Sequence, residues 1–175
     1  MEGHLTVVER ERSDGEADYV RAARAGVGDA YRLAGYLLGN ETEAQDAVQD
    51  ALVKAWRSWP DLRDLDAFGP WFDRIVVNVC RDRMRRHRTL RMVELDAAGE
   101  VEASDIFGSM LEGDEVAAAV DRLSPDQRIV IALRYWRDLT LEQTAETLGL
   151  PLGTVKSRLH YALRALRSEL GGSER

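Results

Sequence analysis

Apolar residues recur every three or four positions in several separate segments, and this period constrains the fold more than any other feature. One set consists of Ala44, Ala47, Val48, Ala51, Leu52 and Ala55. A second set consists of Phe68, Trp71, Phe72, Ile75, Val76 and Val79. Such spacing is typical of one face of an α-helix, and no convincing two-residue alternation of a strand is found. Because apolar stripes must be buried against one another, we predict an all-α protein.

Capping signals indicate where several of the predicted helices begin. Asn40 followed by Glu43 is a cap and N3 pair. Ser124-Pro125-Asp126-Gln127 combines a cap serine, a proline at the first helical position and a glutamine at N3, and Thr140-Leu141-Glu142-Gln143 is a second capping box. The predicted helices cover about 17–38, 41–58, 67–87, 114–123, 125–136, 141–148 and 152–170.

A polar, acidic segment divides these helices into two groups. We therefore predict two small helical domains, 16–88 and 113–171, joined by an acidic flexible linker, 89–112, with tails at 1–15 and 172–175. Gly26 and Gly28 are expected to weaken or kink the first helix, and Pro70 offers an alternative first residue for the third helix, whose start is otherwise expected near residue 67.

Charge is distributed unevenly along the chain. The formal net charge is −7, yet seven arginines face only two acids from Asp73 to Arg91, and four basic residues face none from Pro151 to Arg167. Between them, the stretch from Met92 to Asp126 contains ten acids and one arginine. Because electrostatic attraction to phosphates acts over about one Debye length, the local charge of each segment, rather than the net charge of the chain, decides where a polyanion can dock.

The composition also limits where the protein acts. No stretch approaches the roughly 20 apolar residues that span a bilayer, so we predict no membrane insertion. Cys80 is the only cysteine, which excludes an intrachain disulfide and favours a reducing cytoplasm. We interpret Cys80 as a small apolar filler.

Residues 139–166 form the most informative segment. Two short helical patterns are separated by a tight turn at Gly149, as in a helix-turn-helix whose second helix enters the DNA major groove. The alternative is a helical hairpin with a solvated basic side. The residues expected to face DNA are Gly153, Thr154, Lys156, Ser157, Arg158, His160 and Arg164.

Two further surfaces carry polar patterns. Arg74, Asn78, Arg81 and Arg85 share one stripe of the third helix, which suits phosphates and opened single strands but equally fits a solvated cationic face. On the second helix, Glu43, Asp46, Gln49 and Asp50 form an edge opposite the alanine-rich face. This edge is either solvated or docks a basic partner.

Three segments together resemble the extracytoplasmic-function sigma factors, the minimal sigma subunits of bacterial RNA polymerase. They are DAVQDALVKAW (46–56), FGPWFDRIVVNVCRDRMRR (68–86) and the run from Leu123 to Arg167 that contains LSPDQR, LTLEQTAETLG and GTVKSRL. The motifs occur in the family's order and separation. Ala47 and Ala51 depart from it, since larger apolar residues are common there.

The resemblance implies a role for each surface. Asp46, Gln49 and Asp50 match positions that dock on the β′ clamp helices of core RNA polymerase, with the β subunit as a further partner. Asn78, Asp82, Arg85 and Arg86 match positions that open and read the promoter-proximal element, and we add Arg74 and Arg81 from the stripe. Residues 151–164 match the reader of the upstream promoter element, and the linker is implied to thread toward the polymerase active-site cleft. An anti-sigma factor is a further candidate partner.

Enzymatic function is disfavoured. The sequence has no glycine-rich phosphate loop and no nucleophile motif, and its three histidines lack partners at metal-ligand spacing, so we predict no catalysis, cofactor or metal. The better rival is a stand-alone helix-turn-helix transcriptional regulator whose N-terminal half senses a ligand or dimerises.

Overall fold

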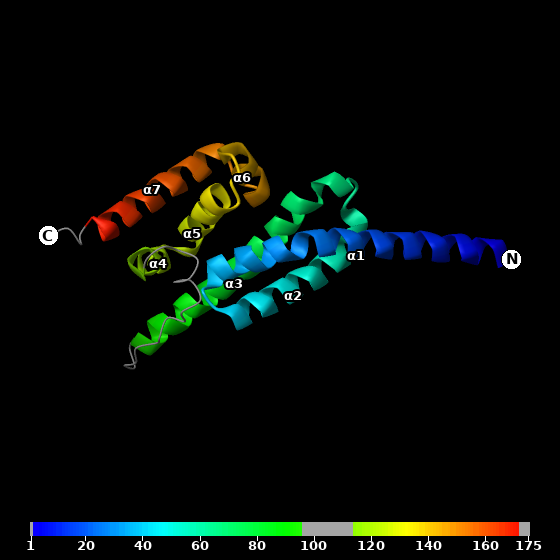
Figure 1. The fold of residues 1–175 in the computed structure, drawn as a ribbon, viewed down its shortest axis with the longest axis horizontal. Helices are drawn as coiled ribbons and strands as arrows, with labels where there is room; N and C mark the ends of the chain where they lie inside the picture. Colours follow the sequence, from blue (N-terminus) through cyan, green and yellow to red (C-terminus); the bar gives the residue numbers. More distant parts are fainter. Residues whose placement is uncertain (1, 96–113, 172–175) are drawn as a thin grey trace.

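Every regular element in the described part of the chain is helical, as predicted (Figure 1). The computed structural model describes the backbone of residues 2–95 and 114–171 and the side chains of 15–90 and 115–171. A first lobe contains α1 (Glu2–Leu38), α2 (Glu41–Ser58) and α3 (Phe68–Leu95), with short 3₁₀ turns at Trp59–Asp61 and Leu65–Ala67. A second lobe contains α4 (Asp114–Asp121), α5 (Pro125–Ile131), a π-helical turn (Ala132–Trp136), α6 (Leu141–Leu148) and α7 (Leu152–Leu170).

The predicted apolar faces of α2 and α3 form the core of the first lobe. All members of the alanine-rich face are buried except Leu52, which is partly buried. Its small side chains allow α1 and α3 to pack closely on α2, and larger residues on α3 fill the space between the helices. The rings of Phe68 and Phe72 stack with centroids 5.3 Å apart. Cys80 is fully buried, and burial raises the pKa of its thiol to about 12, consistent with a filler.

Gly26 does not interrupt α1 but permits a close helix contact. A Cβ atom at position 26 would lie 3.2 Å from Cε1 of Phe68 and 3.6 Å from Cδ1 of Phe72. A Cβ at Gly28 would meet nothing within 4 Å. The expected kink is therefore absent, because packing of α1 on the aromatic face of α3 outweighs the weak helix propensity of glycine.

The start of α1 differs from the prediction. The helix α1 begins at Glu2 rather than near Ala17, in a segment rich in Glu and Arg, which are good helix formers. The helix α3 begins at Phe68, close to the predicted start near residue 67 and two residues before the alternative start at Pro70, because Asp64 caps a 3₁₀ turn that leads directly into it. The missing amide of Pro70 then falls in the first turn, where amides have no helical partner.

The end of α3 also extends into the predicted linker. Residues 89–95, which we assigned to the linker, continue this helix to Leu95. The remainder of the predicted linker, 96–112, lies outside the described residues.

The two capping boxes and the glycine turn predicted in the second lobe are confirmed. In both capping boxes the hydroxyl oxygen accepts from the N3 amide and the glutamine oxygen accepts from the cap amide, around Ser124 and Thr140. Gly149 ends α6 with a φ of 62°, which lies in the left-handed region that glycine tolerates. The π-helical turn was not predicted, and Trp136 within it stacks on Tyr36 of α1 with centroids 5.9 Å apart.

Arg137, directly after the π-helical turn, joins the two lobes. Its guanidinium donates to Oδ2 of Asp73 on α3 from Nε at 3.1 Å and Nη2 at 2.7 Å, and to Oδ2 of Asp29 on α1 from Nη1 at 2.8 Å. The side chain of Asp73 is only 6% exposed. Burial raises the pKa of Asp73 against the opposing effect of Arg137, whereas the hydrogen bond from Arg137 lowers the pKa of Asp29.

We expect leucine to be tolerated at position 28 but not at position 26. Gly26→Leu must displace Phe68 and Phe72 and should lower the free energy of unfolding by about 1–3 kcal/mol. Gly28→Leu is the matched control, and it should be neutral or stabilising by up to about 1 kcal/mol because leucine favours helix. Urea denaturation measures both. Equal effects of the two variants would contradict the close contact assigned to Gly26.

We expect Arg137→Ala to cost about 2–3 kcal/mol of unfolding free energy, because it leaves the buried Asp73 carboxylate without its partner. Asp73→Asn in the Arg137→Ala background should recover much of this loss. Asp138→Asn is the control, since the Asp138 side chain is 97% exposed and its pair with Arg134 should contribute less than about 1 kcal/mol. Thermal and urea denaturation measure the wild type and these three variants. Equal losses of stability in Arg137→Ala and Asp138→Asn would refute the stabilising role assigned to the contacts of Arg137 with Asp73 and Asp29.

Candidate nucleic-acid interface

The acidic edge predicted on α2 lies at the surface of the first lobe. Asp46, Gln49 and Asp50 are all exposed, opposite the buried alanine face. Oδ2 of Asp50 also accepts from Nη2 of Arg83 on α3 at 2.6 Å. Asp50 therefore braces α2 on α3 as well as presenting a charge, a contact that spacing along one helix could not reveal.

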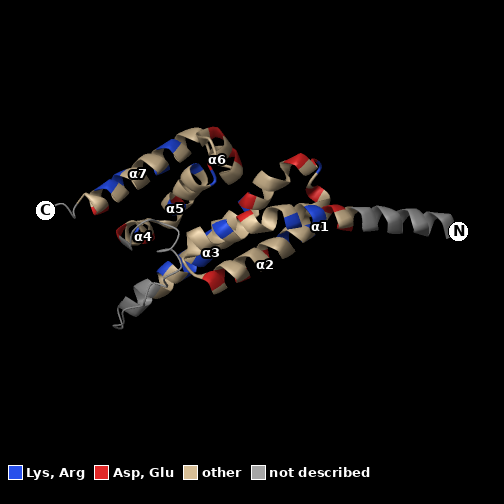
Figure 2. Cartoon of the chain, viewed as in Figure 1, with Lys and Arg blue, Asp and Glu red and all other residues tan. Residues whose placement is uncertain are grey.

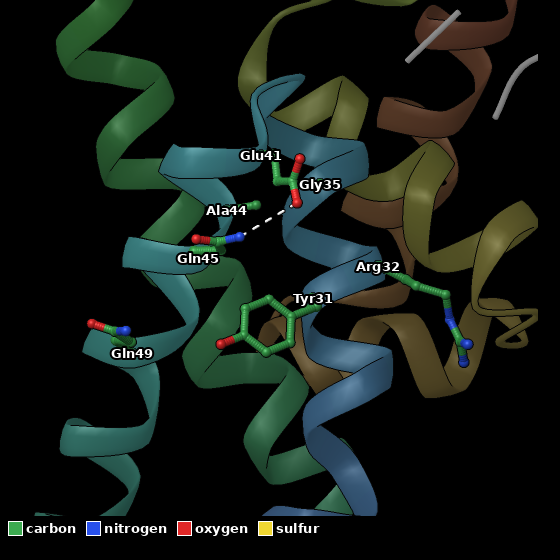
Figure 3. Close-up of a pocket in the computed structure, with 7 residues that line it drawn as sticks. All are labelled: Tyr31, Arg32, Gly35, Glu41, Ala44, Gln45 and Gln49. Carbon is green, nitrogen blue, oxygen red and sulfur yellow. Dashed lines mark hydrogen bonds between the residues drawn. The ribbon is translucent and has the colours of Figure 1, made fainter. Parts of the chain in front are cut away.

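A groove between α1 and α2 adjoins this edge (Figure 3). It has a volume of about 490 Å³ and includes Gln49, and the Tyr31 ring reaches from α1 toward α2 along it. Gln45 donates to Glu41 at 3.4 Å on its rim. Its lining residues are Tyr31, Arg32, Gly35, Glu41, Ala44, Gln45 and Gln49.

Asn78 of the predicted stripe lies in a second groove, between α2 and α3. Lys54, Arg57 and Ser58 of α2 line it together with Ile75, and its volume is about 360 Å³. The groove combines two cations, an amide and an apolar wall, a set that can hold a phosphate and an unstacked base. Sequence reasoning missed the three α2 residues. On α2 they follow Asp50 at i+4, i+7 and i+8, so they continue the side that carries the acidic edge, and the change there from acids to basic and polar residues is the signal that could have found them.

The arginines of the stripe face the second lobe. Nε of Arg81 lies 3.1 Å from Oδ1 of Asp126, at the start of α5, and Nη2 of Arg85 lies 3.8 Å from Oδ2 of the same residue. Burial lowers the pKa of the Arg81 guanidinium, and the charge of Asp126 opposes that shift. Nη2 of Arg74 lies only 2.8 Å from where a Cβ at Gly149 would stand. The remaining two predicted residues, Asp82 and Arg86, are exposed.

The predicted reader helix α7 begins immediately after the glycine turn. Among its predicted DNA-facing residues, the exposed ones are Gly153, Lys156, Ser157, His160 and Arg164. Thr154 is half-buried, and its carbonyl accepts from the Ser157 hydroxyl at 3.0 Å. Tyr161, which sequence reasoning missed, is 58% exposed beside the His160 ring.

Arg158 differs from its neighbours on α7. Its Nη2 lies 3.1 Å from Oδ2 of Asp126, so the reader helix and the stripe of α3 share one carboxylate. Figure 2 shows basic segments along both α3 and α7.

Other classes of site receive no support from the described residues. They contain no cluster of His, Cys, Asp or Glu arranged to hold a metal ion. Within the same ranges, no helix is long and apolar enough to cross a membrane. The polar groups that gather in space are those of the acidic edge, the two grooves and the basic faces of α3 and α7.

Comparison with known proteins matches both lobes to one family. Residues 23–89 match Sigma-70 region 2, and residues 119–168 match Sigma-70, region 4. The RNA polymerase sigma-E factor of Streptomyces avermitilis is 32% identical over 87% of this chain and 83% of its own length. The ECF RNA polymerase sigma factor SigL of Mycobacterium tuberculosis is 37% identical over 80% of this chain and 81% of its own length.

Two solved structures are similar in fold as well as in sequence. The sigma factor RpoE in complex with the anti-sigma factor NepR from Bartonella quintana is 26% identical, with a TM-score of 0.67 over 90% of this chain and 99% of that one. CnrH in complex with the cytosolic domain of CnrY is 27% identical, with a TM-score of 0.57 over 91% of this chain and 99% of that one. The N-terminal match to region 2 excludes the stand-alone regulator. The chain belongs to the sigma-70 family, as a promoter-directing sigma factor of the extracytoplasmic-function group.

Proposed function

We propose that the two lobes divide the work of a sigma factor. Residues 16–88 dock on core RNA polymerase and open the promoter-proximal element, and residues 113–171 recognise the upstream element as duplex. The observation that carries this proposal is the presence of an exposed acidic edge on α2 and basic faces on α3 and α7 in one chain that matches both sigma regions. The protein performs no reaction of its own and acts in the cytoplasm with the polymerase.

The acidic edge of α2 supports a docking role. Asp46 and Gln49 project from the side of α2 opposite the core, so a partner can reach them without disturbing the fold. The adjoining groove offers apolar surface beside this charge, a combination common in protein interfaces. We assign the edge to the β′ clamp helices of the polymerase. Because RpoE is bound by the anti-sigma factor NepR, an anti-sigma protein is a further proposed partner.

The groove around Asn78 supports a role in strand opening. An amide can hydrogen-bond a base edge, the side of Ile75 can pack against an unstacked base, and Lys54 and Arg57 can contact the flanking phosphates. We propose that this groove holds an unpaired base of the proximal element, with Arg86 and the stripe arginines on the flanking backbone.

The start of α7 supports duplex recognition. Lys156, Ser157 and His160 are exposed on the first turns of a helix that follows a glycine-ended turn, as expected for a recognition helix in the major groove. Arg158 and Arg164 are assigned to phosphates, and Gly153 leaves the helix start open to the DNA backbone, since a Cβ there would meet nothing within 4 Å.

We expect Asp46→Arg combined with Gln49→Ala to impair assembly with core polymerase by tenfold or more, because each lost charged contact in such an interface costs about 2 kcal/mol. Both residues are exposed, so the melting temperature should change little. Asp61→Arg, an exposed charge reversal away from α2, is the control. Asp50 is avoided because its substitution also breaks the contact with Arg83. Fluorescence titration with core polymerase measures assembly of both proteins. The docking assignment would be wrong if the Asp46→Arg/Gln49→Ala double variant assembled as tightly as the Asp61→Arg control.

We expect substitutions on α7 and substitutions in the groove around Asn78 to impair different steps of transcription initiation. Lys156→Ala or His160→Ala should weaken upstream recognition by about 1–3 kcal/mol, whereas Asn78→Ala and Lys54→Ala should slow strand opening. Arg167→Ala, exposed near the end of α7, is the control for general loss of charge. Transcription on a template with a pre-melted bubble should rescue the Asn78 and Lys54 variants. Failure of the bubble to rescue either would refute the assignment of this groove to unpaired bases.

A further inference from the structure

Tyr19 on α1 contacts the end of α2 from outside the segment that matches Sigma-70 region 2, which begins at residue 23. Its hydroxyl donates to the carbonyl oxygen of Leu52 at 2.6 Å. Its ring lies edge-on to two indole rings, with centroids 5.0 Å from Trp56 and 5.3 Å from Trp59. One hydrogen bond and two aromatic contacts from a single side chain therefore hold the last turns of α2 against α1.

The ring of Trp59 continues this contact to α3. It lies edge-on to Phe68 with centroids 6.0 Å apart, and Phe68 in turn stacks on Phe72. On the α1 side, a Cβ at Gly15, one turn before Tyr19, would stand 4.0 Å from Nε1 of Trp59. A chain of aromatic rings thus runs from α1 across the end of α2 to the start of α3.

The covalent connection between α2 and α3 contributes little packing of its own. None of residues 59–67 is buried, and only Trp59 and Leu62 are partly buried against the core. Ser58 makes no side-chain capping hydrogen bond to the 3₁₀ turn that follows it. Because segments with little buried surface open most easily, this connection restrains the end of α2 less than the ring contacts of Trp59 do.

The end of α2 forms one wall of the groove around Asn78. Lys54, Arg57 and Ser58 line that wall, and Ile75 lies with Asn78 on the α3 side. A binding site must hold its groups within about 0.5 Å of the productive geometry. A side chain that sets the position of the α2 wall therefore affects binding of a base that it does not touch.

We propose that Tyr19 is a positioning residue for strand opening: by fixing the end of α2, it holds that wall of the groove at the distance from Asn78 that an unpaired base requires. The inference rests on the proposed function, because it requires the groove to hold a base of the proximal element. Loss of the Tyr19 contacts loosens the groove and slows opening. Assembly with core polymerase and upstream recognition use other surfaces and are retained.

Two substitutions separate the hydroxyl of Tyr19 from its ring. Tyr19→Phe removes the hydrogen bond and keeps both ring contacts, whereas Tyr19→Leu removes all three contacts and retains an apolar side chain that favours helix. Tyr135→Leu is the matched control, because Tyr135 is 58% exposed in the second lobe and its ring contacts only the neighbouring Arg134 among the described aromatic and cation–π contacts. Each full-length variant is assembled with core polymerase, and assembly is measured by fluorescence titration.

Opening is measured on a promoter selected from a random library by the wild-type holoenzyme, with 2-aminopurine in its proximal element to report unpaired bases. We expect Tyr19→Leu to slow opening by about tenfold, Tyr19→Phe by about two- to fivefold, and Tyr135→Leu by less than about twofold. Assembly with core polymerase should change by less than about twofold in each variant. A pre-melted bubble should restore transcription by both Tyr19 variants, as it should for Asn78→Ala.

Double variants distinguish positioning of the groove from a general loss of stability. If Tyr19 acts through the groove, adding Asn78→Ala to Tyr19→Leu should slow opening by less than about a further twofold, because both changes affect one interaction. Adding Lys156→Ala should instead weaken promoter binding by the same factor as it does in the wild type, because Lys156 lies on the other lobe.

Slow opening by the Tyr19 variants, with rescue by the bubble and no additive loss with Asn78→Ala, supports the proposal. Normal opening by Tyr19→Leu while Asn78→Ala opens slowly overturns the role of Tyr19 and leaves the proposed function intact. Weaker assembly, additive losses or failure of the bubble to rescue Tyr19→Leu also overturns it, since the role is then structural only. Tyr19→Phe decides in the same way if Tyr19→Leu does not fold. Normal opening by Asn78→Ala would refute the proposed function of the groove, and the inference with it.

Discussion

The guanidinium of Arg137, held between Asp73 and Asp29, determines how the surfaces of this protein are presented. Asp73 is buried on α3, where an unpaired carboxylate would be costly, so its partner must come from outside the first lobe. That partner follows the π-helical turn, which also places Trp136 on Tyr36. Once this bridge is in place, α5 and α6 lie against α3 and the start of α7 approaches the arginine stripe.

The helix α3 carries several functions on different faces. Its aromatic and branched residues fill the core, Arg83 braces α2 through Asp50, and Asp73 anchors the second lobe. The stripe that includes Arg81 uses the remaining face. A helix that packs on so many sides holds rigidly the residues that we propose contact DNA, and such rigidity favours positioning a base in the groove beside Asn78 as proposed.

Local features were predictable from the sequence, and contacts between distant segments were not. The apolar faces, both capping boxes and the glycine turn at Gly149 depend on residues within a few positions of each other. The pairs of Arg137 with Asp73 and Asp29 join residues 64 and 108 positions apart, and no periodicity encodes them. The error at Gly26 arose because packing of α1 on the aromatic residues of α3 outweighed the helix propensity of a single residue.

Asp126 lowers the positive charge locally, at the point where α3 and α7 approach each other. The chain has a net charge of −7, yet two of its segments are strongly basic. Asp126 makes two kinds of favourable electrostatic interaction. Its negative charge interacts with the positive end of the α5 helix dipole, and its carboxylate forms ion pairs with arginines of α3 and α7. An acidic residue inside a capping motif can therefore offset the positive charge of two neighbouring helices locally, while the basic residues of both helices are retained.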